Sequence, residues 1–535
     1  MLTNKINTFI LAGCLLSLAV AGQPKPNIVL IMADDLGYSD IGCYGSEIPT
    51  PNLDMLAEGG IRFNQFYNTS RCCPTRASLL TGLFQHQTGV GQMSEDPGSR
   101  KENIDLNDWG TAGYKGYLNK HCVTIPEVLQ TAGYHTYMTG KWHLGFHEKE
   151  KWPLQRGFEK FYGILAGAAS YFKPQEGRGL TYNNEKLSPP EGKYYTTDAF
   201  TDSAVVFVNS HKDNKPFFLY LAFNAPHWPL HAKEEDIKLF ETRYNIGWDA
   251  VRKKRYDKQI KTGVVNKDWG LSERDTAVRT WAKLSPAERK GVAYRMAVYA
   301  AQVKCLDDNV GKLIAALKQK GQYDNTLIIF LSDNGACAET YQELGSQPDS
   351  LINDPAFSGP VSYGMGWANV SNTPFRKWKN RAEEGGIAAP FIMHWPKGVT
   401  QKNKIVSTPA YLIDVMPTIL ALTGAEYPTI SHGGQTIYPL TGNSLQPAFT
   451  GKPFKQHEYM YWEHQYNAAI RKGNWKAIYS LKNNTWVLFD LSNDRSEQKD
   501  VASTHAALLE DLKIKWQEWA TANFVLPKMA NDRTN

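Results

Sequence analysis

Two short acidic segments of this 535-residue chain could together bind a metal ion. Each follows a continuous apolar run of strand length, the first from Asn27 to Met32 and the second from Thr326 to Leu331. Such runs are typical of parallel strands buried on both faces, and ligands bind at the carboxyl ends of such strands. We therefore expect the side chains that follow the two runs to converge. These side chains are Asp34, Asp35, Asp333 and Asn334. An all-oxygen set suits a hard divalent cation, Ca²⁺ or Mg²⁺, rather than zinc.

A cysteine pair close to an arginine is the second candidate for chemistry. Residues 72 to 82 read Cys-Cys-Pro-Thr-Arg-Ala-Ser-Leu-Leu-Thr-Gly. The stretch from residue 77 to 80 indicates the start of a short helix that Gly82 ends. Cys72 would then lie near the amino end of this helix, which favours an anion. A buried cysteine pair before an amphipathic turn is the alternative that this segment alone leaves open.

This segment resembles the Cys-x-Pro-x-Arg signature of the sulfatases, in which a maturation enzyme converts the first cysteine to formylglycine (3-oxoalanine). The resemblance makes Cys72 the candidate nucleophile and leaves Cys73 in the variable position. It also implies that the acidic segments, together with the modified residue 72, hold one divalent cation, Ca²⁺ in preference to Mg²⁺. A hydrated aldehyde suits sulfate esters because one hydroxyl can attack the sulfur and the second can then collapse to the aldehyde and expel sulfate.

Three further segments resemble sulfatase motifs that place basic side chains after strands. The run from residue 133 to 140 leads into Lys141 and His143, and the run from 216 to 223 leads into His227. In the third, the family's lysine lies five residues before the glutamate of a Glu-Gly-Gly motif, which gives Lys379. Lys377 is the competing assignment.

The resemblance implies a role for each basic group. The cation and Arg76 would hold the hydrated aldehyde, while Lys141, Lys379 and His227 neutralise the sulfate oxygens. His227, together with Lys379, would protonate the departing alcohol. His143 would take the proton of the remaining hydroxyl as sulfate leaves.

The first 21 residues resemble a secretory signal peptide. Lys5 precedes an apolar core from Phe9 to Val20, followed by small residues at the spacing for cleavage. A lipoprotein cleavage box ending in Cys14 is the less favoured alternative, because the apolar stretch continues past it. No other segment reaches membrane length. We therefore expect an exported protein, periplasmic or secreted, that is not integral to the membrane.

Composition gives weaker constraints. The formal net charge of +6 is modest for this length and supports neither nucleic-acid binding nor a polybasic membrane anchor. The run from Arg252 to Arg255 could steer a polyanion, although a solvated helical face is the favoured interpretation. Of seven cysteines, Cys14 would leave with the signal and Cys72 would be modified, so at most two disulfides could form.

The order of predicted elements indicates an α/β fold with two parts. Residues 24–440 are expected to form the catalytic domain, a large mixed, mainly parallel sheet flanked by helices, which in the family is alkaline-phosphatase-like. Ser285 and Glu288 form a capping box before a long predicted helix in this part. Residues 441–535 are expected to form a small antiparallel sheet, with strand-like runs at 458–462, 468–480 and 486–491, and a final helix.

The resemblance implies an exported sulfatase that hydrolyses sulfate monoesters. Sulfated carbohydrates, such as oligosaccharides from polysaccharide degradation, are the expected substrates, with aryl sulfates as further ones. Aromatic residues in the segments 163–198 and 228–284 could stack on sugars or simply hold these loops in place. Two alternatives are a phosphodiesterase or phosphonate monoester hydrolase of the same superfamily, and a non-catalytic protein that binds sulfated glycans.

Overall fold

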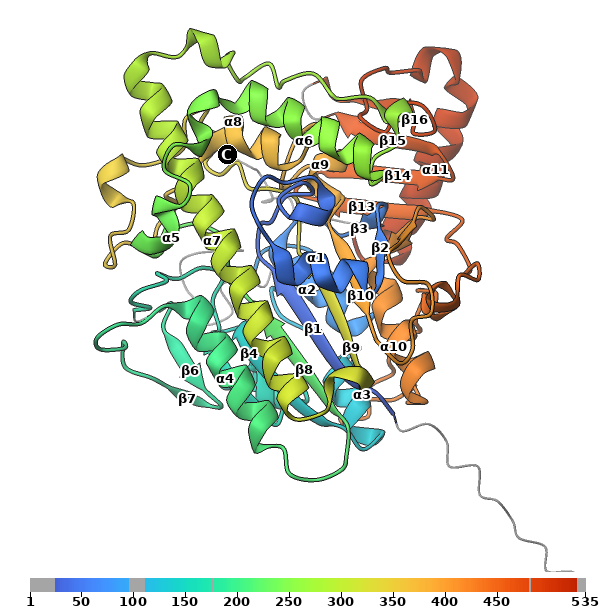
Figure 1. Ribbon diagram of the computed structural model, residues 1–535. Helices are drawn as coiled ribbons and strands as arrows, with labels where there is room; N and C mark the ends of the chain where they lie inside the picture. The colour runs from blue at the N-terminus through green and yellow to red at the C-terminus, as the bar shows by residue number, and fades with distance from the viewer. Residues whose placement is uncertain (1–24, 96–110, 176, 481–482, 527–535) are drawn as a thin grey trace, which may run out of the picture.

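A ten-stranded mixed sheet forms the centre of the molecule (Figure 1). The structure is a computed structural model that describes residues 25–95, 111–175, 177–480 and 483–526. From one edge to the other, the strands of the large sheet are β11 (Lys404–Val406), β2 (Ile61–Phe63), β10 (Phe391–His394), β9 (Thr326–Ser332), β1 (Asn27–Ala33), β8 (Phe217–Ala222), β4 (His135–Lys141), β5 (Lys160–Ile164), β6 (Leu180–Tyr182) and β7 (Glu185–Lys186).

The middle of this sheet is parallel and its flanks are partly antiparallel. β9, β1, β8, β4 and β5 pair in parallel, whereas β10 runs antiparallel to β9 and β2, and β6 and β7 form an antiparallel edge. Residues 27 to 33 of β1 and 326 to 332 of β9 are all buried and pair in register along their whole length. Because paired parallel strands end at the same level, Asp34 and Asp333 leave the sheet side by side.

Helices cover the large sheet, and α4 and α7 cross the face turned toward the viewer in Figure 1. The long helix α7 begins directly after Ser285, whose side chain accepts the N–H of Glu288 in the predicted capping box. The helices are α1 (Pro51–Glu58), α2 (Cys72–Thr81), α3 (Ile125–Thr131), α4 (Thr196–Ser210), α5 (Glu234–Lys238), α6 (Trp248–Thr262), α7 (Pro286–Gln319), α8 (Gly364–Ser371), α9 (Glu384–Ile387), α10 (Val415–Thr423) and α11 (Ala506–Ala522).

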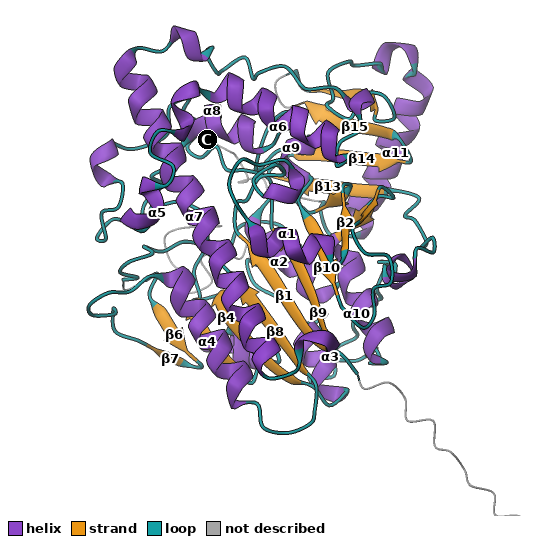
Figure 2. Cartoon of the chain, viewed as in Figure 1, coloured by secondary structure: helices purple, strands orange, loops and turns teal. Residues whose placement is uncertain are grey.

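A second, four-stranded antiparallel sheet lies at the upper right of the view in Figure 2. Its strands are β13 (Met460–His464), β14 (Asn467–Lys472), β15 (Trp475–Ser480) and β16 (Thr485–Asp490). Leu512 of α11 is buried with Ile470, Ala477 and Leu488, so the helix packs on this sheet. A two-stranded parallel pair, β3 (Phe66–Tyr67) with β12 (Ala410–Tyr411), completes the strands. The predicted α/β fold with a small antiparallel sheet and helix is confirmed.

Several details differ from the expectations. The run predicted at 468–480 is two strands with a turn between them, not one. The charged run of α6 is not a solvated face, because Arg252 and Arg255 are buried and only the two lysines between them are exposed. Arg255 instead binds Asp40 and Glu47 through its guanidinium.

The described residues bear on the predicted disulfides but not on the predicted signal peptide. The predicted signal peptide and Cys14 lie outside the described residues. The six described cysteines are all free and buried, so the described part of the chain contains none of the disulfides that the cysteine count allowed. In that part no helix combines the length and the apolar character needed to cross a membrane. The domain boundary at residues 440 and 441 stays a prediction.

Candidate active site

The acidic side chains predicted to converge do lie together at the carboxyl ends of β1 and β9. The Oδ1 atom of Asp333 accepts the backbone N–H of Asp35 at 3.1 Å, and the side-chain amide of Asn334 donates to Asp35 Oδ1 at 2.6 Å. Asp35 has a positive φ of 65°, a conformation that turns the chain sharply at the strand end. Each of these side chains, Asp34 included, is at most 1% exposed.

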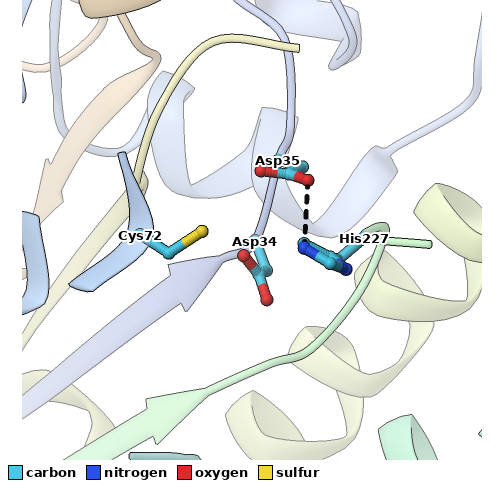
Figure 3. Close-up of side chains that lie close together, drawn as sticks. All are labelled: Asp34, Asp35, Cys72 and His227. Carbon is cyan, nitrogen blue, oxygen red and sulfur yellow. Dashed lines mark ion pairs between the residues drawn. The ribbon is translucent and has the colours of Figure 1, made fainter. Parts of the chain in front are cut away.

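Cys72 is the first residue of α2, and its position brings the thiol to the acidic cluster. Figure 3 shows its sulfur pointing toward the carboxylate of Asp34. One ligand atom from each of Asp34, Asp35, Cys72 and His227 lies within 4.8 Å of the others. Gly82 ends α2 with a φ of 70°, as the sequence predicted.

Three buried cations surround this cluster. Arg76, one turn along α2 from Cys72, donates from Nη2 to Asp333 at 2.9 Å and lies 3.6 Å from Asp34. Lys141 Nζ lies 2.6 Å from Asp34 Oδ2, and Lys379 Nζ lies 2.9 Å from Asp35 Oδ1. Each cation is at most 2% exposed, so these contacts are largely shielded from water.

A glycine lets β4 deliver Lys141 to the site. Gly140 has a φ of 102°, and an added Cβ would lie 1.8 Å from the carbonyl oxygen of Ala222 on β8. A side chain here would have to push β4 away from β8. Because Gly140 has no side chain, β4 stays paired with β8 up to the residue before Lys141, which contacts Asp34.

The two predicted histidines have different partners. His227 Nε2 is 3.4 Å from Asp35 Oδ2, the ion pair dashed in Figure 3, and also 3.4 Å from Lys379 Nζ. His143 follows β4 and is 1% exposed, with its Nε2 2.6 Å from Oε2 of Glu95. His227 thus contacts the acidic cluster directly. His143 instead binds the carboxylate of Glu95.

The donor set fits a hard cation. Asp34 Oδ1 and Asn334 Oδ1 are buried oxygens without a hydrogen-bond partner among the described residues. Such buried orphans are rare unless an ion or water satisfies them. Asp35 and Cys72 each have a possible ligand atom within 4.8 Å of one from Asp34. Both oxygens of Asp333, in contrast, already accept hydrogen bonds. The ligand set predicted from the sequence stays a prediction, with Asp34 and Asn334 as its best-supported members.

Burial and charge shift the pKa values of the cluster. Burial, with the neighbouring Asp333, raises the pKa of Asp34 well above its ordinary value. Lys141 and Arg76 oppose this shift. Burial alone would raise the pKa of Asp333 too, but Arg76 lowers it overall. The Cys72 thiol has a pKa raised to about 12 by burial, so as an unmodified thiol it would be protonated and a poor nucleophile.

The competing lysine does not reach the cluster. Lys377 binds Asp275 at 2.5 Å, whereas Lys379 contacts Asp35 and His227. Tyr171 and Trp248 are among the buried aromatic residues of the two loop segments, and the Tyr171 hydroxyl lies 2.7 Å from the carbonyl oxygens of both Asn224 and His227. These two side chains therefore hold the loops in place.

Two glutamates near the site could not be identified from the sequence. Glu95 binds His143, and Glu339 lies 3.6 Å from Lys379 while pairing with Arg71 at 2.5 Å. Neither belongs to a helix or strand. Because no periodicity or motif marks them, no signal in the chain connects them to residues far away in sequence.

Comparison with known proteins agrees with this geometry. Residues 26–425 match the family model described as Sulfatase, and residues 378–521 match that of N-sulphoglucosamine sulphohydrolase, C-terminal. The chain is 36% identical over 525 residues to an uncharacterized sulfatase of Schizosaccharomyces pombe, with 93% of each chain covered. It is 35% identical over 447 residues to an arylsulfatase of Klebsiella aerogenes, covering 79% of this chain and 92% of the relative.

Solved structures show the same fold. The structure of Ps i-CgsB in complex with k-i-k-neocarrahexaose is 31% identical to this chain, with a TM-score of 0.66 and 93% of each chain covered. The match therefore extends over both sheets. The chain belongs to the sulfatase family and is a sulfuric ester hydrolase.

Proposed function

We propose that this enzyme is an exported sulfatase that acts on sulfated carbohydrates, accepts aryl sulfates, and uses formylglycine at position 72 as its nucleophile. The observation that carries the proposal is the convergence of Cys72 with Asp34, Asp35 and His227 inside a ring of buried cations. Burial raises the pKa of the Cys72 thiol to about 12, so oxidation to formylglycine would supply a nucleophile that the protonated thiol does not.

The side chains match the demands of sulfate ester hydrolysis. A divalent cation bound by Asp34 and its neighbours would supply Lewis-acid chemistry at the position of residue 72. Arg76 would orient the hydroxyl groups of the hydrated aldehyde at the amino end of α2. Lys141 and Lys379 would bind the sulfate oxygens, where fixed charges in a water-poor site are most effective.

Proton transfer falls to the two histidines. Burial, with the charges of Lys379 and Lys141, lowers the pKa of His227 well below its ordinary value. A proton on this ring would therefore be readily given up, which suits the acid that protonates the departing alcohol. His143 would accept the proton of the second hydroxyl as sulfate leaves. In the first step the S–O bond to the alcohol breaks and residue 72 takes the sulfate; in the second the aldehyde re-forms.

The substrate class rests on the relatives. The neighbour named above is in complex with k-i-k-neocarrahexaose, and the bacterial relative is an arylsulfatase. A carbohydrate substrate with aryl sulfates as model substrates is consistent with both. Export through the amino-terminal segment and oxidation of Cys72 by a formylglycine-generating enzyme complete the proposal.

The test compares matched esters. Purified enzyme, matured with a formylglycine-generating enzyme, is assayed on an aryl sulfate, the aryl phosphate and the aryl phosphonate ester, and then on defined sulfated oligosaccharides. Preferential release of sulfate is expected, and Cys72→Ala should abolish it while the protein stays folded. A preference for the phosphorus esters would favour the phosphodiesterase alternative. Glycan binding without turnover would favour the non-catalytic one.

A further inference from the structure

His143 is held in one orientation by a carboxylate. Its Nε2 lies 2.6 Å from Oε2 of Glu95, while Oε1 of the same carboxylate accepts the N–H of Gly167 at 2.9 Å. An ionised carboxylate can only accept hydrogen bonds, so the imidazole must donate from Nε2. The proton of the neutral ring is therefore on Nε2, and Nδ1 carries the lone pair.

The free nitrogen of this ring is buried. Nδ1 of His143 has no hydrogen-bond partner among the described residues, although the side chain is only 1% exposed. Burying a nitrogen without a partner is costly, so Nδ1 is available to a polar group bound beside it. Gly167 keeps the pair compact, since an added Cβ would lie 2.4 Å from His143 and 2.5 Å from Glu95.

The surrounding charges keep the ring neutral until a proton arrives. Burial lowers the pKa of His143 to about 4; Lys141 and Arg76 add to this, and Glu95 opposes it. Cys73 is the fourth titratable group beside the ring, with its sulfur within 4.8 Å of the His143 and Glu95 ligand atoms. Among the described residues named here, Glu95 is thus the neighbour whose charge stabilises the imidazolium.

We propose that Glu95 is the positioning residue that fixes His143 with its proton on Nε2, so that Nδ1 is the base in the sulfate-releasing step. The inference rests on the proposed formylglycine mechanism. In this step Nδ1 takes the proton of the free hydroxyl on residue 72, and the O–H electron pair forms the C=O bond. The bond between the carbon and the sulfate oxygen breaks, its electrons leave with sulfate, and Glu95 balances the new imidazolium charge.

This role predicts an unusual kinetic signature. The alcohol leaves before the step that needs His143, so a weaker base should slow only the second half of the reaction. In Glu95→Gln, kcat on an aryl sulfate should fall on the order of 10²-fold, within the usual range for a general base. KM should fall in parallel, and kcat/KM should stay near that of the unmodified enzyme. A burst of one aryl alcohol per active site should precede the slow turnover.

Chemical rescue distinguishes positioning from folding. The Glu95 side chain is 35% exposed, so a small anion can reach the space it leaves. Formate should therefore restore part of the kcat of Glu95→Ala and have no effect on His143→Ala. Glu159→Gln is the matched control, because Glu159 binds His135 at 2.7 Å on the remote end of the same strand, β4, and its kinetics should not change.

The results of these experiments either support or contradict the role of Glu95. A burst with unchanged kcat/KM and rescue by formate supports the role of Glu95. A Glu95→Gln enzyme with unaltered kcat, or one that loses kcat/KM without a burst, overturns it. If the enzyme with unaltered Glu95 releases no sulfate from any ester, the proposed function fails instead, and the two failures are distinguishable.

Discussion

Charge balance among single residues prepares the site for an anion. Asp34, Asp35 and Asp333 are matched by the three buried cations Arg76, Lys141 and Lys379. With all three carboxyl groups ionised, these six side chains together carry no net charge. A bound divalent cation would add two positive charges, which matches the charge of a sulfate group developing in a site of low dielectric.

Two lysines close in sequence provide a matched test at this scale. Lys379→Ala should lower kcat/KM on an aryl sulfate by about 10²- to 10³-fold, because it removes a fixed charge from the developing sulfate. Lys377→Ala should change it by less than about threefold, since Lys377 pairs with Asp275 instead. Steady-state kinetics of the two variants check this. Equal losses would show that the assignment of Lys379 is wrong.

Metal removal tests the same balance. Without a cation, the burial of Asp34 and its repulsion by Asp333, which raise its pKa, are not relieved, so chelation by EDTA should abolish turnover and lower the melting temperature. Adding Ca²⁺ should restore both, and binding to the native state only would raise the melting temperature with ion concentration. A melting temperature and rate unaffected by EDTA would argue against a metal site.

At the scale of elements, a buried ion network connects α9 to the C-terminal sheet. Glu384 accepts from Lys476 of β15 at 2.9 Å, from Arg495 at 2.7 Å and from Tyr67 of β3 at 2.8 Å. Glu497 shares Lys476 at 2.7 Å, and Glu384, Lys476, Arg495 and Glu497 have no exposed side-chain surface. The same glutamate lies five residues after Lys379, so the network also supports the loop that delivers this lysine.

The two glutamates of the network should differ in their effect on stability. Burial alone would raise the pKa of Glu384, but Lys476 and Arg495 lower it to about 2, below its ordinary value of 4.5. Its stabilising contribution is therefore present above about pH 4.5 and lost as the pH falls toward 2. Burial, with the charge of Glu384, raises the pKa of Glu497 to about 7 against the attraction of Lys476.

Glu384→Gln should lower the free energy of unfolding at pH 7 by about 3–5 kcal/mol, because buried Arg495 loses its carboxylate partner and buried Lys476 loses one of its two. Glu497→Gln should cost less than about 1 kcal/mol, since this carboxyl is already partly protonated at that pH. Urea unfolding at pH 7 and pH 4 measures both. The Glu384→Gln deficit should shrink at the lower pH, and equal deficits for both variants would refute this account.

The pattern of apolar residues predicted the strands that position the site, but it could not predict the contacts between charged side chains. The runs before Asp34 and Asp333 are buried on both faces, so their continuous hydrophobicity marks them as central strands. The burial of Arg255 could not be predicted, because a charged run reads as solvated until its partners Asp40 and Glu47 are known. The contact of Glu95 with His143 likewise could not be predicted, because the fold alone brings these two residues together.

In the whole molecule the two sheets depend on each other. Trp462 of β13 is 2% exposed and donates from its indole nitrogen to the carbonyl oxygen of Asn68, close to Cys72 in sequence. Glu463 binds His86 at 2.9 Å, and both side chains are buried. The C-terminal sheet therefore covers the segment that flanks α2.

A chain ending at residue 440 should not form a stable catalytic domain. Its loss of Lys476 and Arg495 would leave Glu384 buried without cations, at a cost of several kcal/mol. We expect the fragment to be insoluble or unfolded, as measured by soluble yield and circular dichroism. A soluble fragment with native-like spectra would show that the small sheet is an independent addition.

The chemistry of residue 72 is the central claim for the whole enzyme, and mass spectrometry of its tryptic peptide tests it most directly. In active enzyme we predict that Cys72 has lost its sulfur and two hydrogens and gained one oxygen, and that activity rises in proportion to the oxidised fraction. An active preparation in which Cys72 is entirely an unmodified thiol would contradict the account.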